Sequence, residues 1–153
     1  MKKILFLFLL IPMLMITGCK KKDKSFNDST GIEITYKNAK GQDLLNATTP
    51  NYFSADNIHL YNVVNGVKKE VNYPNYDIPH NFVVVLNHST HVYFLRVFLE
   101  TDTTLLQLNR NITDTITAEF TRNINATIVT KVLYNEKLEW DDMSVPRAFT
   151  IVK

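Results

Sequence analysis

Cysteine is nearly absent from this sequence: Cys19 is the one cysteine among 153 residues. A single thiol cannot close a disulfide within the chain, so burial of apolar side chains has to stabilise the fold. Glycine and proline are also scarce, with four and five residues. These counts exclude a low-complexity chain, and no internal repeat of about 20 to 50 residues is visible.

The sequence also lacks the motifs of common catalytic and cofactor sites. No serine stands in a glycine-flanked elbow, and no glycine-rich loop could hold a phosphate. His88 and His91 flank an expected turn, but no carboxylate lies near them in the sequence, and zinc sites usually need three or four ligands. We therefore expect no enzymatic activity, no cofactor and no metal site. A hydrolase whose site the sequence does not reveal is an alternative.

The excess of positive charge lies at the N-terminus. The full sequence has 17 basic and 15 acidic residues, but without Lys2 and Lys3 the two counts are equal. Leaving out residues 20–24 as well gives 11 basic against 14 acidic residues, a net charge of −3. The body is thus mildly acidic, which argues against a nucleic-acid partner because phosphate binding needs a basic surface.

Long apolar runs are absent except near the N-terminus, where residues 4–16 are almost wholly apolar. A run of this length matches the core of an export signal and falls short of the roughly 20 residues that a transmembrane helix needs. Two lysines precede the run, and the small residues Thr17 and Gly18 follow it. The segment then reaches Cys19, where an ordinary export signal would have a small-x-small cleavage site.

The segment Ile16-Thr17-Gly18-Cys19 resembles the lipobox of bacterial lipoproteins. The resemblance implies that the thiol of Cys19 receives a diacylglycerol, that the chain is cut before Cys19, and that the new amino group is acylated. One acyl chain binds a membrane weakly, at about 0.8 kcal/mol per buried methylene group, whereas two or three chains anchor a protein stably. The expected partner is therefore a membrane, bound through the lipid on Cys19. An ordinary export signal with a free cysteine is the alternative.

Residues 20–29 are polar and charged, and such a segment buries too little apolar surface to offset its ordering entropy. We therefore divide the chain into a signal peptide at 1–18, a lipidated flexible tether at 19–29 and a domain at 30–153. Lys20 is not the aspartate that retains related lipoproteins in the inner membrane, so the resemblance implies an outer-membrane location. Surface lipoproteins of Bacteroidota often carry acidic residues here, and the lysines leave the periplasmic face and the cell surface both open.

The body has the two-residue alternation of half-buried β-strands, as where Ile32, Ile34 and Tyr36 alternate with polar residues. Its clearest turn signal is Asn65-Gly66, because both residues tolerate the positive φ of a type I′ hairpin. The pattern predicts nine strands, near residues 32–36, 57–64, 67–73, 82–86, 91–99, 104–108, 115–122, 127–134 and 147–152.

Two of these strands differ from the rest. Residues 82–86 form a continuous apolar run, which predicts a strand buried on both faces. Residues 91–99 form the most aromatic strand, which we expect to be central. The strand count and turn spacing indicate an all-β fold, a single immunoglobulin-like or transthyretin-like β-sandwich of seven to nine antiparallel strands. A small β-barrel is the alternative.

Two sets of residues are candidates for a role at the surface. Tyr52 with Phe53, and Tyr73 with Tyr76, place aromatic rings on loops, where they either form a platform for a sugar ring or fill the ends of the sandwich. A second set consists of hydroxyl residues that follow an aspartate in triplets resembling the O-glycosylation acceptor of exported Bacteroidota proteins: Ser29, Thr103 and Thr115.

The whole chain resembles small outer-membrane lipoproteins of Bacteroidota of uncharacterised function, a resemblance that implies no activity. We expect a lipid-anchored lipoprotein of the cell envelope that is a non-enzymatic binding or structural accessory module. Its further partner is another envelope protein or a glycan, and a surface glycan-binding lipoprotein is the alternative. A flat apolar patch or an open strand edge would favour a protein partner, and an exposed aromatic strip would favour a glycan.

Overall fold

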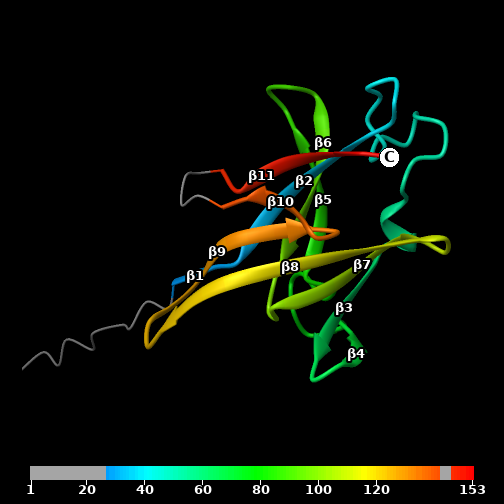
Figure 1. Ribbon diagram of the computed structural model, residues 1–153. Coiled ribbons are helices and arrows are strands. Elements are labelled where there is room, and N and C mark those ends of the chain that lie inside the picture. Colours follow the sequence, from blue (N-terminus) through cyan, green and yellow to red (C-terminus); the bar gives the residue numbers. More distant parts are fainter. Residues whose placement is uncertain (1–26, 142–145) are drawn as a thin grey trace, which may run out of the picture.

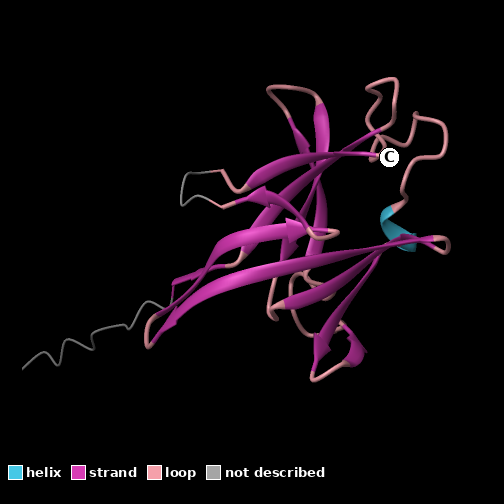
Figure 2. Cartoon of the chain, viewed as in Figure 1, coloured by secondary structure: helices cyan, strands magenta, loops and turns pink. Residues whose placement is uncertain are grey.

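The computed structural model describes residues 27–141 and 146–153. Residues 1–26 and 142–145 lie outside the described part, and with them Cys19 and the expected signal peptide. The described chain has one short 3-10 helix and eleven strands (Figures 1 and 2). They are β1 (Asn27–Ser29), β2 (Gly31–Lys37), η1 (Ala55–Asn57), β3 (His59–Val64), β4 (Val67–Glu70), β5 (Phe82–Asn87), β6 (Val92–Phe98), β7 (Thr103–Asn109), β8 (Ile112–Asn123), β9 (Ala126–Tyr134), β10 (Lys137–Trp140) and β11 (Ala148–Val152).

The strands form two sheets. Sheet A has the order β1-β9-β8-β7-β3-β4, and β10 joins it by pairing with β9. β1 and β10 lie along the same edge of β9, because β1 pairs with its first residues and β10 with its last ones. Sheet B has the order β11-β2-β6-β5. Both sheets are open at their edges, so the all-β prediction is confirmed in the form of a two-sheet sandwich, and the closed barrel is excluded.

The prediction of antiparallel pairing throughout is wrong at two edges. β1 pairs with β9 in parallel, and β11 pairs with β2 in parallel. Two strands joined by a hairpin have to run antiparallel. These two pairs join segments that lie far apart in the chain, so their strands can pair in the parallel or the antiparallel direction. Sheet B nevertheless has the predicted strand 91–99 in its interior, since β6 lies between β2 and β5.

The structure contains two strands that the sequence analysis did not predict. β10 follows a two-residue turn at Asn135 and Glu136, whose φ angles are 48° and 67°. Both residues have the positive φ of an Asn-Gly hairpin turn, but the second residue is glutamate. Because the glycine is missing, the sequence shows no hairpin signal at this place. β1 covers the last three residues of the segment 19–29 that we expected to be a flexible tether, so these three residues belong to sheet A.

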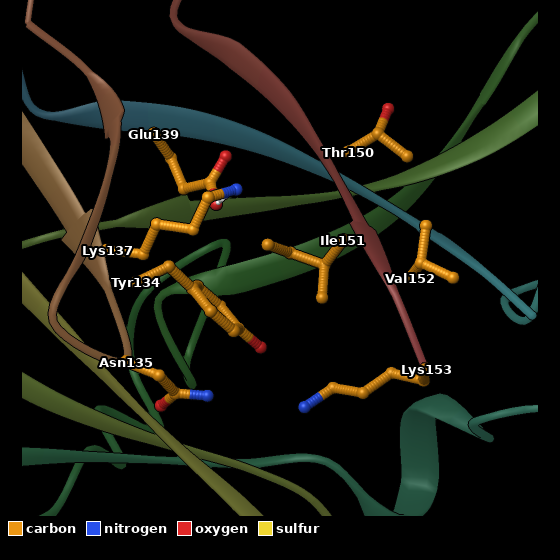
Figure 3. A pocket seen from close by; sticks show the side chains of 8 residues that line it. All are labelled: Tyr134, Asn135, Lys137, Glu139, Thr150, Ile151, Val152 and Lys153. Atoms are coloured by element: carbon orange, nitrogen blue, oxygen red, sulfur yellow. Dashed lines mark hydrogen bonds and ion pairs between the residues drawn. The ribbon is translucent and has the colours of Figure 1, made fainter.

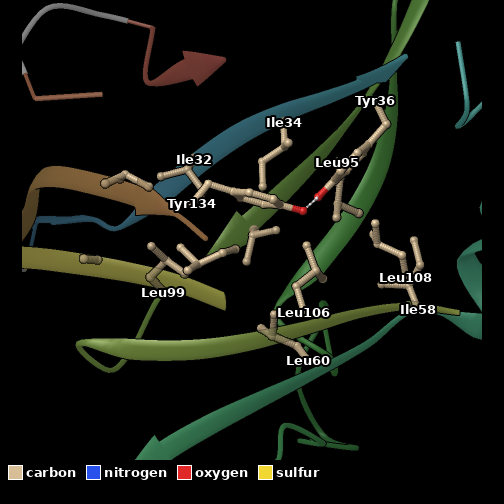
Figure 4. Close-up of a cluster of buried hydrophobic side chains, with 14 of the residues drawn as sticks. Ile32, Ile34, Tyr36, Ile58, Leu60, Leu95, Leu99, Leu106, Leu108 and Tyr134 are labelled. Atoms are coloured by element: carbon tan, nitrogen blue, oxygen red, sulfur yellow. Dashed lines mark hydrogen bonds between the residues drawn. The ribbon is translucent and has the colours of Figure 1, made fainter. Parts of the chain in front are cut away.

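The core lies between the two sheets and follows the predicted alternation (Figure 4). On β2, Ile32, Ile34 and Tyr36 have no exposed surface, while the residues between them are half-buried. Sheet A contributes the matching side of the core. The apolar side chains of this sheet that are less than 2% exposed are Leu60, Leu106, Leu108, Ile116, Val129 and Val132. Burial of an aliphatic side chain of this size contributes about 1.5–3 kcal/mol, so this layer is the main source of stability.

β5 is not the fully buried strand that its apolar run predicted. It forms the edge of sheet B, and its residues from Phe82 to Leu86 are all half-buried. Val83 and Val85 lie on the outer face of the sheet, because they pair with Arg96 and Phe94, whose neighbours Leu95 and Val97 point into the core. The continuous run therefore marks a strand with an apolar outer face, a case that periodicity cannot separate from full burial.

The predicted hairpin turn between β3 and β4 is confirmed. Asn65 and Gly66 have φ angles of 51° and 77°, and Val64 pairs with Val67. A Cβ atom added to Gly66 would meet no atom within 4 Å, so only the backbone conformation restricts this position.

We expect Gly66→Val to lower the free energy of unfolding by about 1–2 kcal/mol, because a β-branched residue is strained at positive φ. Urea unfolding of the variant and parent chains measures this difference. Gly66→Asn is the matched control, since asparagine tolerates this conformation and should cost much less. Equal midpoints for Gly66→Val and the parent would contradict the strain argument.

Candidate functional site

The most extensive buried polar cluster in the described chain is centred on Asp114 of β8, whose side chain is 5% exposed. Its Oδ2 accepts a hydrogen bond from the Tyr134 hydroxyl at 2.6 Å. Its Oδ1 accepts from Nδ2 of Asn135 at 2.7 Å and from Nζ of Lys153 at 2.6 Å. The Tyr134 hydroxyl donates its hydrogen bond to Asp114. In the 2.9 Å bond between the two tyrosine hydroxyls, Tyr36 is therefore the donor and Tyr134 the acceptor (Figure 4). The cluster thereby links β2, β8, β9 and the residue after β11.

These hydrogen bonds decide the protonation states in the cluster. Burial by itself raises the pKa of Asp114, but the hydrogen bonds from Lys153, Tyr134 and Asn135 outweigh burial and hold the pKa below its ordinary value of 3.8. Burial raises the pKa of both Tyr36 and Tyr134 far above that of a free tyrosine. At neutral pH the cluster therefore contains an ionised carboxylate and two protonated tyrosines.

A hollow of about 400 Å³ opens beside this cluster, between β10 and β11 (Figure 3). Tyr134, Asn135 and Lys153 form its inner wall, and an ion pair between Lys137 and Glu139 at 2.8 Å lies on its rim. Asp114 is not among the residues that line this hollow, and its carboxylate already accepts three hydrogen bonds from the chain itself. The chemistry of the cluster is that of a structural hydrogen-bond network.

The sequence analysis missed this cluster, although one signal for it was present. Asp114 lies two and four residues before Ile116 and Ala118 on β8, and both of these are buried. Because side chains of a strand alternate between its two faces, Asp114 is on the inner face with them. A carboxylate at such a position requires buried partners. The partners of Asp114, Tyr134 and Lys153, lie too far along the chain for a local sequence pattern to connect them with it.

The four candidate aromatic residues do not form one platform. Phe53 is 5% exposed and packs edge-on against Tyr36 at 5.7 Å, so it fills the core. Tyr73 and Tyr76 pack on each other at 5.2 Å in the loop before β5, and the Tyr73 hydroxyl donates to Glu100 at 2.9 Å. Tyr76 is 66% exposed and borders a hollow of about 430 Å³.

Tyr52, the fourth candidate, is partly exposed and lies in the loop that follows Pro50. The aromatic contacts of the described chain do not connect it with Tyr73 or Tyr76. The structure thus supports a surface role for the Tyr73–Tyr76 pair more than for the loop of Tyr52 and Phe53.

All three candidate O-glycosylation residues are in strands. Ser29 belongs to β1, and its Oγ accepts a hydrogen bond from Nη1 of Arg147 at 2.6 Å. Thr103 begins β7, and Thr115 lies opposite Leu105 in the β7–β8 pair. Each of the three is half-buried. Cys19, the expected lipidation residue, lies outside the described residues.

The histidines of the described chain are dispersed. His59 forms a 2.8 Å contact with Glu70, and His80 bonds the main-chain oxygen of Val71 at 3.2 Å. His88 and His91 lie exposed in the turn between β5 and β6. Within residues 27–141 and 146–153, no three His, Cys, Asp or Glu side chains gather as a metal site would require. The same residues contain no helix with the length and apolar character needed to cross a membrane.

The outer face of sheet B carries an apolar patch of half-buried side chains. We call it the β5–β6 patch, and its members are Val83, Val85, Val92, Phe94 and Phe98. Arg96 lies between Phe94 and Phe98 on this face and forms an ion pair with Glu33 at 2.6 Å. A shallow groove of about 390 Å³ runs over Val92 and Phe94 toward β11. Apolar side chains on the outer face of a sheet make this face a candidate interaction site.

The main chain of β5 is also open along its outer edge, where no described strand pairs with it. The Phe98 N–H donates to the Asn81 carbonyl, which sets the alternation of the β5–β6 ladder. By that alternation the main-chain groups of Val83 and Val85 face β6, and those of Val84 and Leu86 point outward. Residues 82–86 at this edge include no charged residue and no proline, the features that usually protect an open edge from pairing.

Comparison with models of known protein families gives no match for this chain. Comparisons with curated proteins and with solved structures give none either.

Proposed function

We propose that this chain is a lipid-anchored lipoprotein of the outer membrane whose β-domain binds a protein partner without catalysing a reaction. The lipid attachment rests on the sequence Ile16-Thr17-Gly18-Cys19. The immunoglobulin-like or transthyretin-like class of the sandwich stays a prediction and forms part of the proposal.

One observation carries the binding role: the β5–β6 patch lies directly beside the open edge of β5. A partner strand added to this edge would bond the outward main-chain groups of Val84 and Leu86, as in other complexes formed by strand addition. The apolar side chains of the patch would then give the new strand a surface to pack on. The main-chain bonds supply affinity, and the side chains of the patch supply selectivity.

We expect Val85→Lys to abolish capture of the partner, because a charge on the outer face of β5 opposes both strand addition and apolar packing. The measurement is affinity capture of the full, anchored chain from its native envelope, with mass spectrometry of the bound proteins. Thr113→Lys on the exposed face of β8 is the matched control, since it adds the same charge elsewhere. A protein retained by the parent and by the control but lost with Val85→Lys supports the proposal. Identical capture by all three chains would contradict it.

A glycan is the second candidate partner, and the exposed Tyr76 favours it. The hollow beside Tyr76 is lined by amide and carboxylate groups and by one further ring, from Asn75, Asp77, Asn81 and Phe98. Aromatic faces stack on sugar rings, and amides bind hydroxyl groups. Capture of a polysaccharide that is lost with Tyr76→Ala and kept with Val85→Lys would favour this candidate.

A hydrolase is the least supported of the three hypotheses. A general acid or base needs a free position facing a substrate. Asp114 is the most buried carboxylate of the described chain, and three side chains already donate to it.

A further inference from the structure

We infer that the β8–β9 turn of the anchored protein faces the lipid bilayer and that Ile124 at this turn contacts it. This inference rests on the proposed lipid attachment at Cys19. It adds an orientation of the domain and a second point of membrane contact, which come from the structure.

The position of β1 places the start of the domain at this turn. β1 and β9 run in parallel, and Asn27 lies opposite Ala126, the first residue of β9. The β8–β9 turn, Ile124 and Asn125, directly precedes Ala126 in the chain. Figure 1 shows β1 and this turn at the same end of the molecule. The chain therefore enters the domain beside the turn.

The number of residues before β1 limits how far the anchor can lie from this end. Cys19 precedes Asn27 by eight residues, so the two α-carbons are at most about 29 Å apart in a fully extended chain. β8 has 12 residues and at about 3.4 Å per residue extends about 37 Å from this turn to the β7–β8 turn. The anchor is too short for the β7–β8 turn to face the bilayer, so of the two ends of β8 only the β8–β9 end can do so.

The side chain at this end suits contact with lipid. Ile124 is 86% exposed, more than the other large exposed apolar residues of the described chain. Asn123 and Asn125 flank it, and the N–H of Asn125 donates to Oδ1 of Asn123 at 2.9 Å, which shapes the turn. An apolar side chain between two amides matches the boundary between acyl chains and headgroups. The nearby Arg122 is paired with Asp102 at 3.1 Å, so the turn carries little net charge against the bilayer.

A single apolar side chain is too small to hold the domain on a membrane by itself. The lipid on Cys19 keeps the turn close to the membrane surface, and this raises the effective concentration of Ile124 at the bilayer. The side chain can therefore bind the membrane even though its own affinity is small. The contact should therefore depend on the anchor.

The test places an environment-sensitive fluorophore on Asn125→Cys in the full lipidated chain, reconstituted into vesicles of phosphatidylethanolamine and phosphatidylglycerol. Lipidation occupies the thiol of Cys19, so the new cysteine is the free thiol for labelling. The control position is Asn111→Cys, exposed in the β7–β8 turn at the other end of β8. A second variant adds Ile124→Glu to Asn125→Cys. A third sample is the chain from residue 19 with Cys19→Ala and Asn125→Cys, mixed with the same vesicles.

We expect the fluorophore at residue 125 to shift its emission to shorter wavelength and to be quenched by spin-labelled lipid. The label at residue 111 should show neither effect. Ile124→Glu and the loss of the lipid should each return the label at residue 125 to the emission it has in water. Equal emission at residues 125 and 111 in the anchored chain would overturn the inference while leaving the lipid attachment intact. A mass of the N-terminal peptide without acyl groups would overturn both.

Discussion

Asp114→Ala should lower the free energy of unfolding by about 3 kcal/mol, because it removes the shared acceptor of one buried and two part-buried hydrogen bonds. Without the carboxylate, the buried Tyr134 hydroxyl loses the partner that offsets its desolvation, the exposed Asn135 loses a hydrogen bond, and Lys153 loses its counter-charge. The side chain of Lys153 is 22% exposed and can turn toward water, which keeps the loss below that of a fully buried pair. Urea unfolding of the variant and parent chains, followed by circular dichroism, measures the difference.

The pH dependence of this contribution follows from the lowered pKa of Asp114. A carboxylate with a lowered pKa in the folded state stabilises the protein fully above its unfolded pKa, near 3.8, and this contribution is lost as the pH falls through the folded value. The free-energy difference between the parent and Asp114→Asn should therefore be constant from pH 7 to about pH 5 and shrink at lower pH. A difference that stays the same down to about pH 2 would mean that Asp114 has the same pKa in the folded and the unfolded protein, so that its partners do not favour the ionised form.

The tyrosines of the cluster provide a matched control. Tyr36→Phe removes a donor to Tyr134 but leaves the bond from Tyr134 to Asp114 in place. It should cost about 1 kcal/mol, close to an ordinary buried hydrogen bond. A loss as large as that of Asp114→Ala would show that the bond between the two tyrosines stabilises the fold as much as the carboxylate does.

Cys19→Ala should abolish lipid attachment completely while the β-domain stays folded. The thiol is the proposed site of the diacylglycerol, and the chain has no second cysteine that could replace it. The substitution lies eight residues before β1 and changes no residue of the described domain. Growth with radiolabelled palmitate, followed by isolation of the protein, tests the first part. Circular dichroism of the same protein tests the second.

Two controls make this result specific to the thiol. Lys20→Ala changes the neighbouring residue and keeps the cysteine, so it should take up palmitate as the parent does. The second control exports Cys19→Ala behind a signal with a small-x-small cleavage site, which separates loss of the lipid from retention of an uncleaved apolar run at residues 4–16. This protein should leave the membrane fraction. Palmitate in either Cys19→Ala protein would show that the lipid is attached elsewhere.

The sequence by itself determined the features that depend on neighbouring residues. Ile32, Ile34 and Tyr36 are buried as their alternation predicts, because successive side chains of a strand point to opposite faces. Asn65 and Gly66 form the predicted turn, because their small penalty at positive φ is a property of the residues themselves. These local signals were enough to identify an all-β domain and most of its strands.

Only the tertiary structure decided which strands are neighbours and what each face meets. The apolar run at residues 82–86 is the same sequence whether it is covered on both sides or forms an edge, and its place beside β6 alone makes it an edge. Asp114, Tyr134 and Lys153 likewise form one cluster only because β8, β9 and the end of β11 converge there. Pairing between distant segments depends on the packing of the whole chain, and for that reason no local pattern reports it.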